Sequence, residues 1–296
     1  MKKLKHILNV IGVRFVVLLG PVLNDRLYLQ WLWRFKMEGK LDLENPKTFN
    51  EKLQWLKLYD RKPEYTMMVD KVKVKEYVAE KIGVEYIIPT IAVWSTPEEI
   101  DFEVLPNQFV LKCSHNSGGL FICKDKTKVS MNKWNSVLET LRKSLKYDYY
   151  KLGREWPYKN VDRKIFAEQY MVDKSDSDLK DYKFFCFNGV PKYVLVATDR
   201  SRDVRFDFFD MDFNHVPFRQ TYDKLADKKI DRPENFEDMI AVSTTLSQNI
   251  PHVRVDLYNI NGKIYFGEMT FFNNSGFEGF VPKEWDKQIG DLIKLN

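Results

Sequence analysis

Two Asn-Gly pairs, Asn188-Gly189 and Asn261-Gly262, constrain the fold of this chain more than any other feature of its sequence. Asn-Gly between two β-type runs is the strongest short signal for a tight hairpin, because both positions readily adopt positive φ. The runs that flank the two pairs are Tyr182–Asn188 with Lys192–Thr198 and His252–Tyr258 with Lys263–Thr270. The sequence therefore predicts two antiparallel hairpins in its C-terminal half.

Further strands and several helices are expected around these hairpins. Short apolar runs predict strands near Tyr86–Ile91 and at Phe109–Cys113, Leu120–Cys123, Lys164–Met171 and Phe206–Met211. Helices are expected within residues 25–60, where Thr48 and Glu51 have capping-box spacing, and at Val69–Ile82, Trp134–Tyr147 and Phe236–Ser247. No fixed-period repeat is present, and the sum is an α+β fold.

The N-terminal segment is both basic and apolar. Three lysines within the first five residues precede a run from Ile7 to Leu23, which Asn9 and Arg14 interrupt. The run is shorter than the ~20 clean apolar residues of a membrane span, and no small-residue cleavage site follows it. Two interpretations stay open: an amphipathic helix packed on the body, and a helix in a membrane interface whose lysines meet anionic lipid.

Length, charge and cysteine content narrow the functional classes. A chain of 296 residues fits about two lobes. Its net charge, 47 − 42 = +5 with the signs interspersed, argues against a nucleic-acid partner. Three cysteines without a CxxC pair indicate a reducing, cytoplasmic compartment and exclude a thiolate zinc site. The four histidines are scattered, so a metal ion would be held by carboxylates, as Mg²⁺ is.

One group of residues could bind phosphate. Lys112 lies near the end of the expected strand Phe109–Cys113, and the chain then enters a small-residue loop, Ser114–Gly119. Backbone N–H groups of a glycine-rich loop can approach phosphate closely, and the lysine adds a positive charge. The residue order of a P-loop is absent. The alternative is therefore a hairpin tip with a purely structural role.

A second group could hold a divalent cation. Arg254 and Asp256 share one face of their strand because side chains alternate, and the following turn brings Glu268 near Asp256. Two carboxylates on neighbouring strands can hold Mg²⁺ together with phosphate oxygens. A cross-strand ion pair on a solvated face is an equally open alternative. For Asp181 and Lys183, which lie beside another strand, an exposed ion pair is the simplest interpretation.

Several short stretches occur in a specific order along the chain. They are Asn-Pro-Lys-Thr-Phe-Asn-Glu-Lys-Leu-Gln-Trp-Leu-Lys (45–57), Asp70-Lys71 with Gly83 and Pro89 after it, Leu-Pro-Asn-Gln-Phe-Val-Leu-Lys (105–112), Asp-Tyr-Lys-Phe-Phe-Cys-Phe-Asn-Gly (181–189), Arg-Val-Asp-Leu-Tyr (254–258) and Tyr-Phe-Gly-Glu-Met-Thr-Phe (265–271). Together they resemble the TupA-like (teichuronopeptide-type) family of the ATP-grasp superfamily, which belongs to bacterial surface-polysaccharide clusters. The resemblance covers roughly residues 25–290.

The resemblance implies a fold and a division of the chain. The fold is the α+β ATP-grasp fold, in which two α+β lobes grip the nucleotide. Residues 61–296 would form the catalytic region, with a smaller flap lobe at about 100–170, and residues 1–60 a helical N-terminal segment.

The resemblance also implies roles for individual residues. The residues implied in ATP binding are Lys71, Lys112, Ser117, Gly118, Gly119, Glu168, Gln169, Tyr170, Met171 and Asp181. The implied Mg²⁺ ligands are Asp256, Glu268, Thr270 and Asn273, and the implied catalytic cations are Arg254, Lys183 and Arg200. Thr270 stands where superfamily members commonly have asparagine, so Asn273 or Asn274 is considered as the substitute ligand.

The reaction implied by the resemblance is ATP-dependent ligation of a carboxylate to an amine through an acyl phosphate. The implied partners are ATP, Mg²⁺, a uronic acid in a glycan or nucleotide sugar, and an amino acid or other amine. The polysaccharide would be a capsule, an O-antigen or a teichuronopeptide. The expected location is the cytoplasm, with peripheral contact at the inner face of its membrane as an alternative.

Two other functional classes are weighed against the ligase. A glycosyltransferase would use a metal-binding Asp-x-Asp, and Asp210-Met211-Asp212 has that pattern, although it lies in a Phe-rich stretch. A non-catalytic nucleotide-binding or membrane-scaffold protein would not need the intact set Lys112, Asp256 and Glu268. No Ser-His-Asp or Cys-His arrangement suggests a covalent mechanism.

Overall fold

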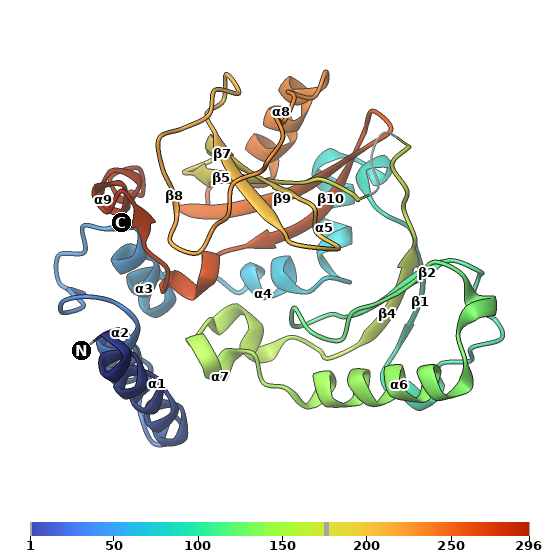
Figure 1. Ribbon diagram of the computed structural model, residues 1–296, viewed down its shortest axis with the longest axis horizontal. Coiled ribbons are helices and arrows are strands. Elements are labelled where there is room, and N and C mark those ends of the chain that lie inside the picture. Colours follow the sequence, from blue (N-terminus) through green and yellow to red (C-terminus); the bar gives the residue numbers. More distant parts are fainter. Residues whose placement is uncertain (1, 175–177, 296) are drawn as a thin grey trace.

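Two antiparallel sheets organise the chain, and helices cover them and join them (Figure 1). The structure is a computed structural model that describes residues 2–174 and 178–295. Its α-helices are α1 (Lys2–Leu19), α2 (Asp25–Lys36), α3 (Phe49–Tyr59), α4 (Glu64–Val69), α5 (Val74–Ile82), α6 (Met131–Lys146), α7 (Tyr150–Gly153), α8 (Phe236–Leu246) and α9 (Glu284–Gly290). None of the described helices is long and apolar enough to cross a bilayer.

The larger sheet contains both predicted hairpins. Its strands are β5 (Asp181–Phe187), β6 (Val190–Thr198), β7 (Arg205–Phe209), β9 (His252–Ile260) and β10 (Lys263–Thr270), in the order β10-β9-β5-β6-β7. Positive φ occurs at both residues of each Asn-Gly pair, with values of 50° and 80° at the first turn and 52° and 78° at the second. This conformation is the reason that the two pairs specify their hairpins.

The two faces of the larger sheet bury different helices. Phe184 contacts Phe236 of α8 on one face, with the ring centroids 5.6 Å apart. Phe185 points to the other face and contacts Phe49 of α3, at 6.4 Å. Because side chains alternate along a strand, Asp181 and Lys183 lie on the same face as Phe185. The predicted site residues of β5 therefore face away from α8. A separate two-stranded sheet consists of β8 (Arg219–Gln220) and β11 (Phe280–Val281), and it packs against the core of the larger sheet.

The smaller sheet forms the second lobe. Its strands are β1 (Thr90–Trp94), β2 (Phe109–Cys113), β3 (Phe121–Cys123) and β4 (Ile165–Gln169), in the order β1-β4-β2-β3. Helix α6 packs on one face through Trp134 and Leu141, which share a core cluster with Phe109 and Leu111. The expected hairpin of β2 and β3 is present, and its loop is Ser114–Leu120.

The helix predicted at Val69–Ile82 ends where expected but begins later, at Val74. Helix α4 ends at Val69 and α5 begins at Val74, with a turn between them. The carboxylate of Asp70 accepts hydrogen bonds from the backbone N–H groups of Val72 and Lys73, at 2.9 and 3.2 Å. An Asp side chain that satisfies nearby N–H groups competes with continuous helix. The break places Lys71 in the turn rather than on a helix.

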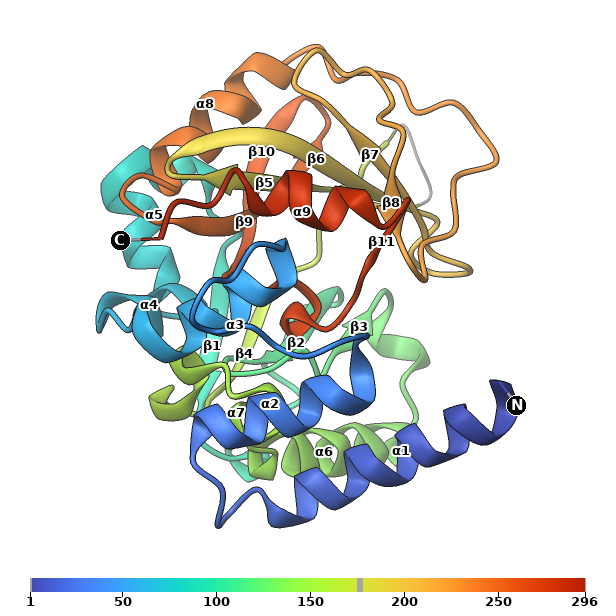
Figure 2. The ribbon, with the colours of Figure 1, turned by 90° about the vertical axis from the view of Figure 1, so that its left-hand side faces the viewer.

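The N-terminal helices α1 and α2 form a hairpin at one end of the molecule (Figure 2). Val16, Tyr28, Leu29, Leu32 and Trp33 are buried together in its interface and against the body. The following helix, α3, begins with the predicted capping box: the Thr48 side chain accepts from the N–H of Glu51, whose own side chain accepts from the N–H of Thr48.

Lys57, on the last turn of α3, is a fully buried ammonium group that joins distant segments. It donates to the carbonyl oxygens of Gly153 and Ser275, at 2.7 and 2.8 Å, and to the side-chain oxygen of Gln54, at 3.0 Å. Burial lowers the pKa of Lys57 to about 7, while Glu155 opposes that effect. Gln54 donates to the carbonyl of Gly276, at 2.7 Å. Helix α3 therefore fixes the loop that follows β10.

Replacing Lys57 with methionine should destabilise the protein by about 2–3 kcal/mol, because the buried carbonyl groups would lose their donor. Urea unfolding measures the change in the free energy of unfolding. Lys143→Met on α6 is the control, since that side chain is 77% exposed and its loss should change stability by less than about 0.5 kcal/mol. Equal unfolding curves for the two variants would contradict the assigned role of Lys57.

Candidate active site

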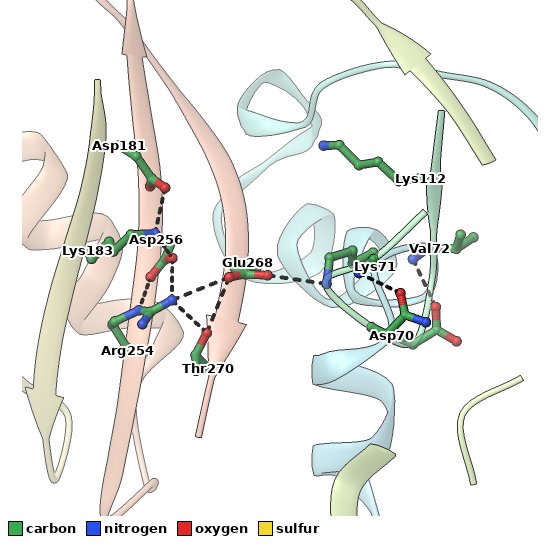
Figure 3. A network of polar contacts seen from close by, with 12 residues as sticks. Asp70, Lys71, Val72, Lys112, Asp181, Lys183, Arg254, Asp256, Glu268 and Thr270 are labelled. Atoms are coloured by element: carbon green, nitrogen blue, oxygen red, sulfur yellow. Dashed lines mark hydrogen bonds and ion pairs between the residues drawn. The ribbon is translucent and has the colours of Figure 1, made fainter. Parts of the chain in front are cut away.

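A cavity between the two sheets collects most of the charged residues that the sequence singles out (Figure 3). Nine charged side chains line its polar part: Lys71, Lys75, Lys112, Glu168, Asp181, Lys183, Arg200, Asp256 and Glu268. They come from the turn before α5, from α5 itself, from both sheets and from the segment after β6. The cavity contains both cations and carboxylates, so the ion pairs that they form determine its electrostatic potential.

On the larger sheet, a β-bulge positions the two carboxylates that were predicted to hold a metal ion. Asp256 of β9 lies opposite Glu268 of β10, and the register between these strands shifts at Gly267. A side chain at Gly267 would meet the backbone oxygen of Asp256 at 3.0 Å. A bulge re-aims the side chain that follows it. The absence of a side chain at Gly267 thus lets Glu268 turn into the cavity beside Asp256.

Arg254 holds Asp256 from behind the cavity wall. Its Nε and Nη2 donate to the two carboxylate oxygens of Asp256, at 2.7 and 2.8 Å. Nη2 also donates to Thr270 at 3.1 Å and to Glu268 at 3.4 Å, and Nη1 donates to the side-chain oxygen of Asn273. Such bidentate pairing fixes the plane of the carboxylate. Burial raises the pKa of Asp256, while Arg254 and Lys183 oppose that rise.

Lys183 joins the carboxylates of two neighbouring strands. Its ammonium group lies 2.5 Å from Asp181 of the same strand and 2.6 Å from Asp256. Burial alone would lower the pKa of Lys183, but Asp181 and Asp256 raise it, so the group is a stable cation. Arg200 also approaches Asp181, at 3.6 Å, and its guanidinium lies 5.6 Å from the centre of the Tyr258 ring. The exposed ion pair considered for Asp181 and Lys183 is in fact buried.

On the smaller lobe, two lysines share one carboxylate. Glu168 of β4 lies 2.6 Å from Lys112 of β2 and 2.6 Å from Lys75 of α5. Burial alone would raise the pKa of Glu168, but the two lysines lower it, so the group stays ionised. Lys75 also donates to the backbone oxygen of Ile88 at 2.8 Å. One carboxylate thus aligns two ammonium groups along the cavity wall.

Lys71 and Glu268 connect the two sides of the cavity. Figure 3 shows Glu268 between the Arg254 cluster and Lys71, whose Nζ lies 3.3 Å from the Glu268 carboxylate. The backbone N–H of Lys71 donates to Ser114 at the base of the β2–β3 loop, at 3.1 Å. Burial would raise the pKa of Glu268, but Lys71, Arg254 and Lys183 lower it to about 2. Glu268 is therefore an anion at any physiological pH.

The polar cavity continues into an apolar compartment. The apolar side chains that line this second part are Ile88, Val110, Leu120, Ile122, Met171, Val172 and Leu179. The strand end Glu168, Gln169, Tyr170 and Met171, which the resemblance implied in ATP binding, also lines it. Lys112, Glu168, Arg200 and Tyr258 border both compartments. A molecule with a flat apolar part and a polyanionic tail would match this sequence of surfaces.

The β2–β3 loop forms one wall of the polar compartment. Ser117 and Gly118 line the cavity. The side chain of Asn116 accepts from the N–H of Gly118 at 2.9 Å and donates to the backbone oxygen of Ser144 at 3.0 Å, which ties the loop to the end of α6. Gly119 has a φ of +68° and no room for a side chain, because a Cβ would lie 2.6 Å from the Cys113 sulfur. Gly119 shapes the loop and is not among the lining residues.

The predicted residues thus separate into two layers. Arg254, Thr270 and Asn273 are not among the residues that line the polar compartment; they surround Asp256 and Glu268 from behind. Asn274, the alternative ligand, instead donates to Gln220 at 3.3 Å and to Glu278. Sequence reasoning missed Lys75, Ile88 and Tyr258. Lys75 pairs with Glu168, which is distant in sequence, so no local pattern indicated its place in the cavity.

The Asp-x-Asp pattern considered for a glycosyltransferase has a local structural role. One carboxylate oxygen of Asp210 accepts from the N–H groups of Asp212 and Asn214, at 3.0 and 2.7 Å. The residue thereby closes the turn after β7, as Asp commonly does in turns. Neither Asp210 nor Asp212 lines the interlobe cavity.

Two carboxylates of the cavity could supply part of the ligand shell of a Mg²⁺ ion. Among residues 2–174 and 178–295, no group of three or more His, Cys, Asp and Glu side chains is close enough to hold a metal ion. Asp256 and Glu268 are adjacent and ionisable, but further oxygen ligands would have to come from elsewhere. Mg²⁺ in nucleotide sites commonly takes one or two protein carboxylates and completes its shell with phosphate oxygens and water. The two carboxylates fit that kind of site.

The structure is distantly similar to several solved structures. The D-alanine–D-alanine ligase of Bacillus anthracis complexed with ATP is 16% identical, with 77% of this chain and 65% of that chain covered and a TM-score of 0.43. The Helicobacter pylori D-alanine–D-alanine ligase is 12% identical, with 84% and 70% covered and a TM-score of 0.41. A RimK domain ATP-grasp protein of Sphaerobacter thermophilus is 9% identical, with 77% of this chain and 69% of that chain covered and a TM-score of 0.41. No curated protein gave a significant sequence match.

Comparison of the sequence with protein-family models identifies the family of this chain. The sequence matches the family described as TupA-like ATPgrasp over residues 51–294, which is most of the chain. The matched part begins inside α3 and includes both sheets and every residue of the cavity described above. The two α+β lobes with a cavity between them are the arrangement that the resemblance implied. The chain is therefore a member of the TupA-like ATP-grasp family and has the ATP-grasp fold.

Proposed function

We propose that this chain is an ATP-dependent carboxylate–amine ligase of bacterial surface-polysaccharide biosynthesis. One observation carries the proposal: an apolar compartment opens into a compartment where Lys71, Lys75, Lys112 and Lys183 face the carboxylates Asp256 and Glu268. Phosphoryl transfer is catalysed chiefly by positioning and by neutralisation of charge. This cavity has the groups for both tasks, and membership of the ATP-grasp family supports their assignment to ATP.

The adenine of ATP would occupy the apolar compartment against the strand end at Met171. Arg200 borders both compartments and Asp181 lines the polar one, so they would lie near the ribose and the first phosphates. The β- and γ-phosphates would then reach Lys112, Lys75 and Lys71. Each of these lysines has a carboxylate partner in the structure, so the cavity keeps its cations aligned before the nucleotide arrives. Such preorganisation lowers the reorganisation that binding requires.

Asp256 and Glu268 would hold Mg²⁺ at the phosphate end, with phosphate oxygens completing its ligand shell. Bound there, Mg²⁺ would neutralise charge on the transferring phosphoryl group. Arg254 and Lys183 keep Asp256 in place, and Thr270 and Asn273 keep Arg254 in place. Lys71, which pairs with Glu268, would be free to bind phosphate once Glu268 has a metal partner.

The substrate carboxylate would attack the γ-phosphorus of ATP, forming an acyl phosphate and releasing ADP. The amine would then attack the acyl carbon and release phosphate, leaving an amide. The β2–β3 loop beside the phosphates would exclude water from the acyl phosphate. We propose a uronic acid as the carboxylate and an amino acid as the amine, with the reaction in the cytoplasm. The three free cysteines suit that reducing compartment.

The acyl phosphate gives the sharpest test. With ATP, Mg²⁺, hydroxylamine and a panel of free and nucleotide-linked uronic acids, the right carboxylate should yield a hydroxamate and an equal amount of ADP. A sugar kinase would yield ADP and a phosphate ester that resists hydroxylamine. Glycosyl transfer from a nucleotide sugar, with neither ADP nor hydroxamate, would overturn the ligase assignment.

Lys112→Ala should weaken the binding of Mg²⁺·ATP at least tenfold, which corresponds to about 1.4 kcal/mol. The reason is the loss of one of the two ammonium groups that Glu168 aligns. Isothermal titration calorimetry measures the dissociation constant. Lys128→Ala serves as the control because Lys128 belongs to the same lobe and is 82% exposed, so its affinity should match that of the parent. Binding of a UDP-sugar without binding of ATP would favour the glycosyltransferase.

Asp256→Asn and Glu268→Gln should each reduce ADP release roughly a hundredfold or more, because Mg²⁺ needs charged oxygen ligands. Thr270→Ala should have a milder effect, since Thr270 contacts Arg254. Asp212→Asn is the matched control: it alters the Asp-x-Asp pattern outside the cavity and should leave turnover unchanged. Circular dichroism confirms that each variant is folded. Near-normal turnover of Asp256→Asn would place the metal site elsewhere.

A further inference from the structure

Helix α1 has a fixed inner face. Gly12 packs so closely on α2 that a Cβ at this position would lie 2.3 Å from the Phe35 ring. Val16, one turn later, is completely buried, and Gly20 continues the same side of the chain against Tyr28. The rotation of α1 about its axis is therefore determined by close packing, and so is the identity of the residues that point outward.

Most of the exposed side chains of α1 are apolar. We call the outer apolar face the set of exposed residues Ile7, Leu8, Ile11, Phe15, Leu18, Val22, Leu27 and Trp31. Leu18 is 76% exposed and Val22 is 80% exposed. The rings of Phe15 and Trp31 stack with their centroids 6.4 Å apart, so α1 and α2 present one continuous surface. Figure 2 shows α1 along one end of the molecule, remote from the larger sheet.

The N-terminal segment that carries most of this face has charge of one sign. Residues 1–24 contain Lys2, Lys3, Lys5 and Arg14 and no Asp or Glu, which gives a formal charge of +4 with His6 neutral. Arg14 is exposed and lies one helical turn from Ile11 and from Leu18, among the exposed apolar residues of α1. The nearest acidic residue on α2, Asp25, already pairs with Arg61 and Arg154.

We propose that the outer apolar face lies in the interface of a lipid bilayer that contains anionic lipid. Exposed aliphatic side chains with an aromatic pair would enter the boundary between headgroups and acyl chains, and the basic residues would meet lipid phosphates. A second copy of the chain would cover the same face less well, because it would bring +4 against +4. None of the described helices can span the bilayer, so the contact is peripheral.

Vesicle flotation with the full chain tests the proposal. The protein should float with vesicles of phosphatidylcholine containing about 30 mol% phosphatidylglycerol and bind pure phosphatidylcholine at least tenfold more weakly. Raising the salt concentration from about 0.1 to about 0.5 M should also reduce binding, since it screens the lysines and Arg14. These two results separate lipid charge from apolar adsorption alone.

Ile11→Asp and Leu18→Asp should each reduce flotation roughly tenfold or more, because each places a negative charge in the outer apolar face. Val104→Asp is the control, as Val104 is 73% exposed but belongs to the smaller lobe. All three sites are exposed, so thermal melting should stay unchanged. Equal flotation of parent and variants, or no flotation with either vesicle, would overturn the proposal. A lipid-free dimer that Ile11→Asp dissociates, seen by light scattering, would assign the face to a contact between copies instead.

Discussion

The ion pair between Lys71 and Glu268 is the interaction on which the geometry of the cavity depends. It joins the turn before α5 to the last strand of the larger sheet, and the same Lys71 is bonded through its backbone to the β2–β3 loop. The distance between the lobes, the position of the loop and the charge of Glu268 are therefore coupled. A polyanion that separated Lys71 from Glu268 would act on all three at once.

Behind this pair lies a second tier that substrate would not reach. Thr270 and Asn273 orient Arg254, and Arg254 orients Asp256. The loop that contains Asn273 is in turn fixed by Gln54 and Lys57 from α3. The N-terminal motif at 45–57 thus has a physical reason: it supports the active-site loop from the side opposite the cavity.

Local chemistry decided how much could be predicted from the sequence. Both Asn-Gly hairpins and the Thr48 cap follow from residues adjacent in the chain, and the sequence placed them correctly. The break between α4 and α5 was missed because the predicted helix ran through Asp70, whose carboxylate instead accepts hydrogen bonds from the backbone N–H groups of Val72 and Lys73. Lys75 was missed because its partner, Glu168, is distant in sequence. No pattern in the sequence indicated that Thr270 contacts Arg254 rather than lining the cavity.

The capping box of α3 has a practical consequence for anyone who shortens this protein. The family match begins at residue 51, whereas the helix is started by Thr48 and the buried Asn50 bonds to Asp286 of α9. A chain trimmed to the matched boundary would retain every charged side chain of the cavity, yet its first helix would begin without a cap and fray toward Gln54 and Lys57. The region defined by the family match therefore lacks the start of the helix that supports the active-site loop.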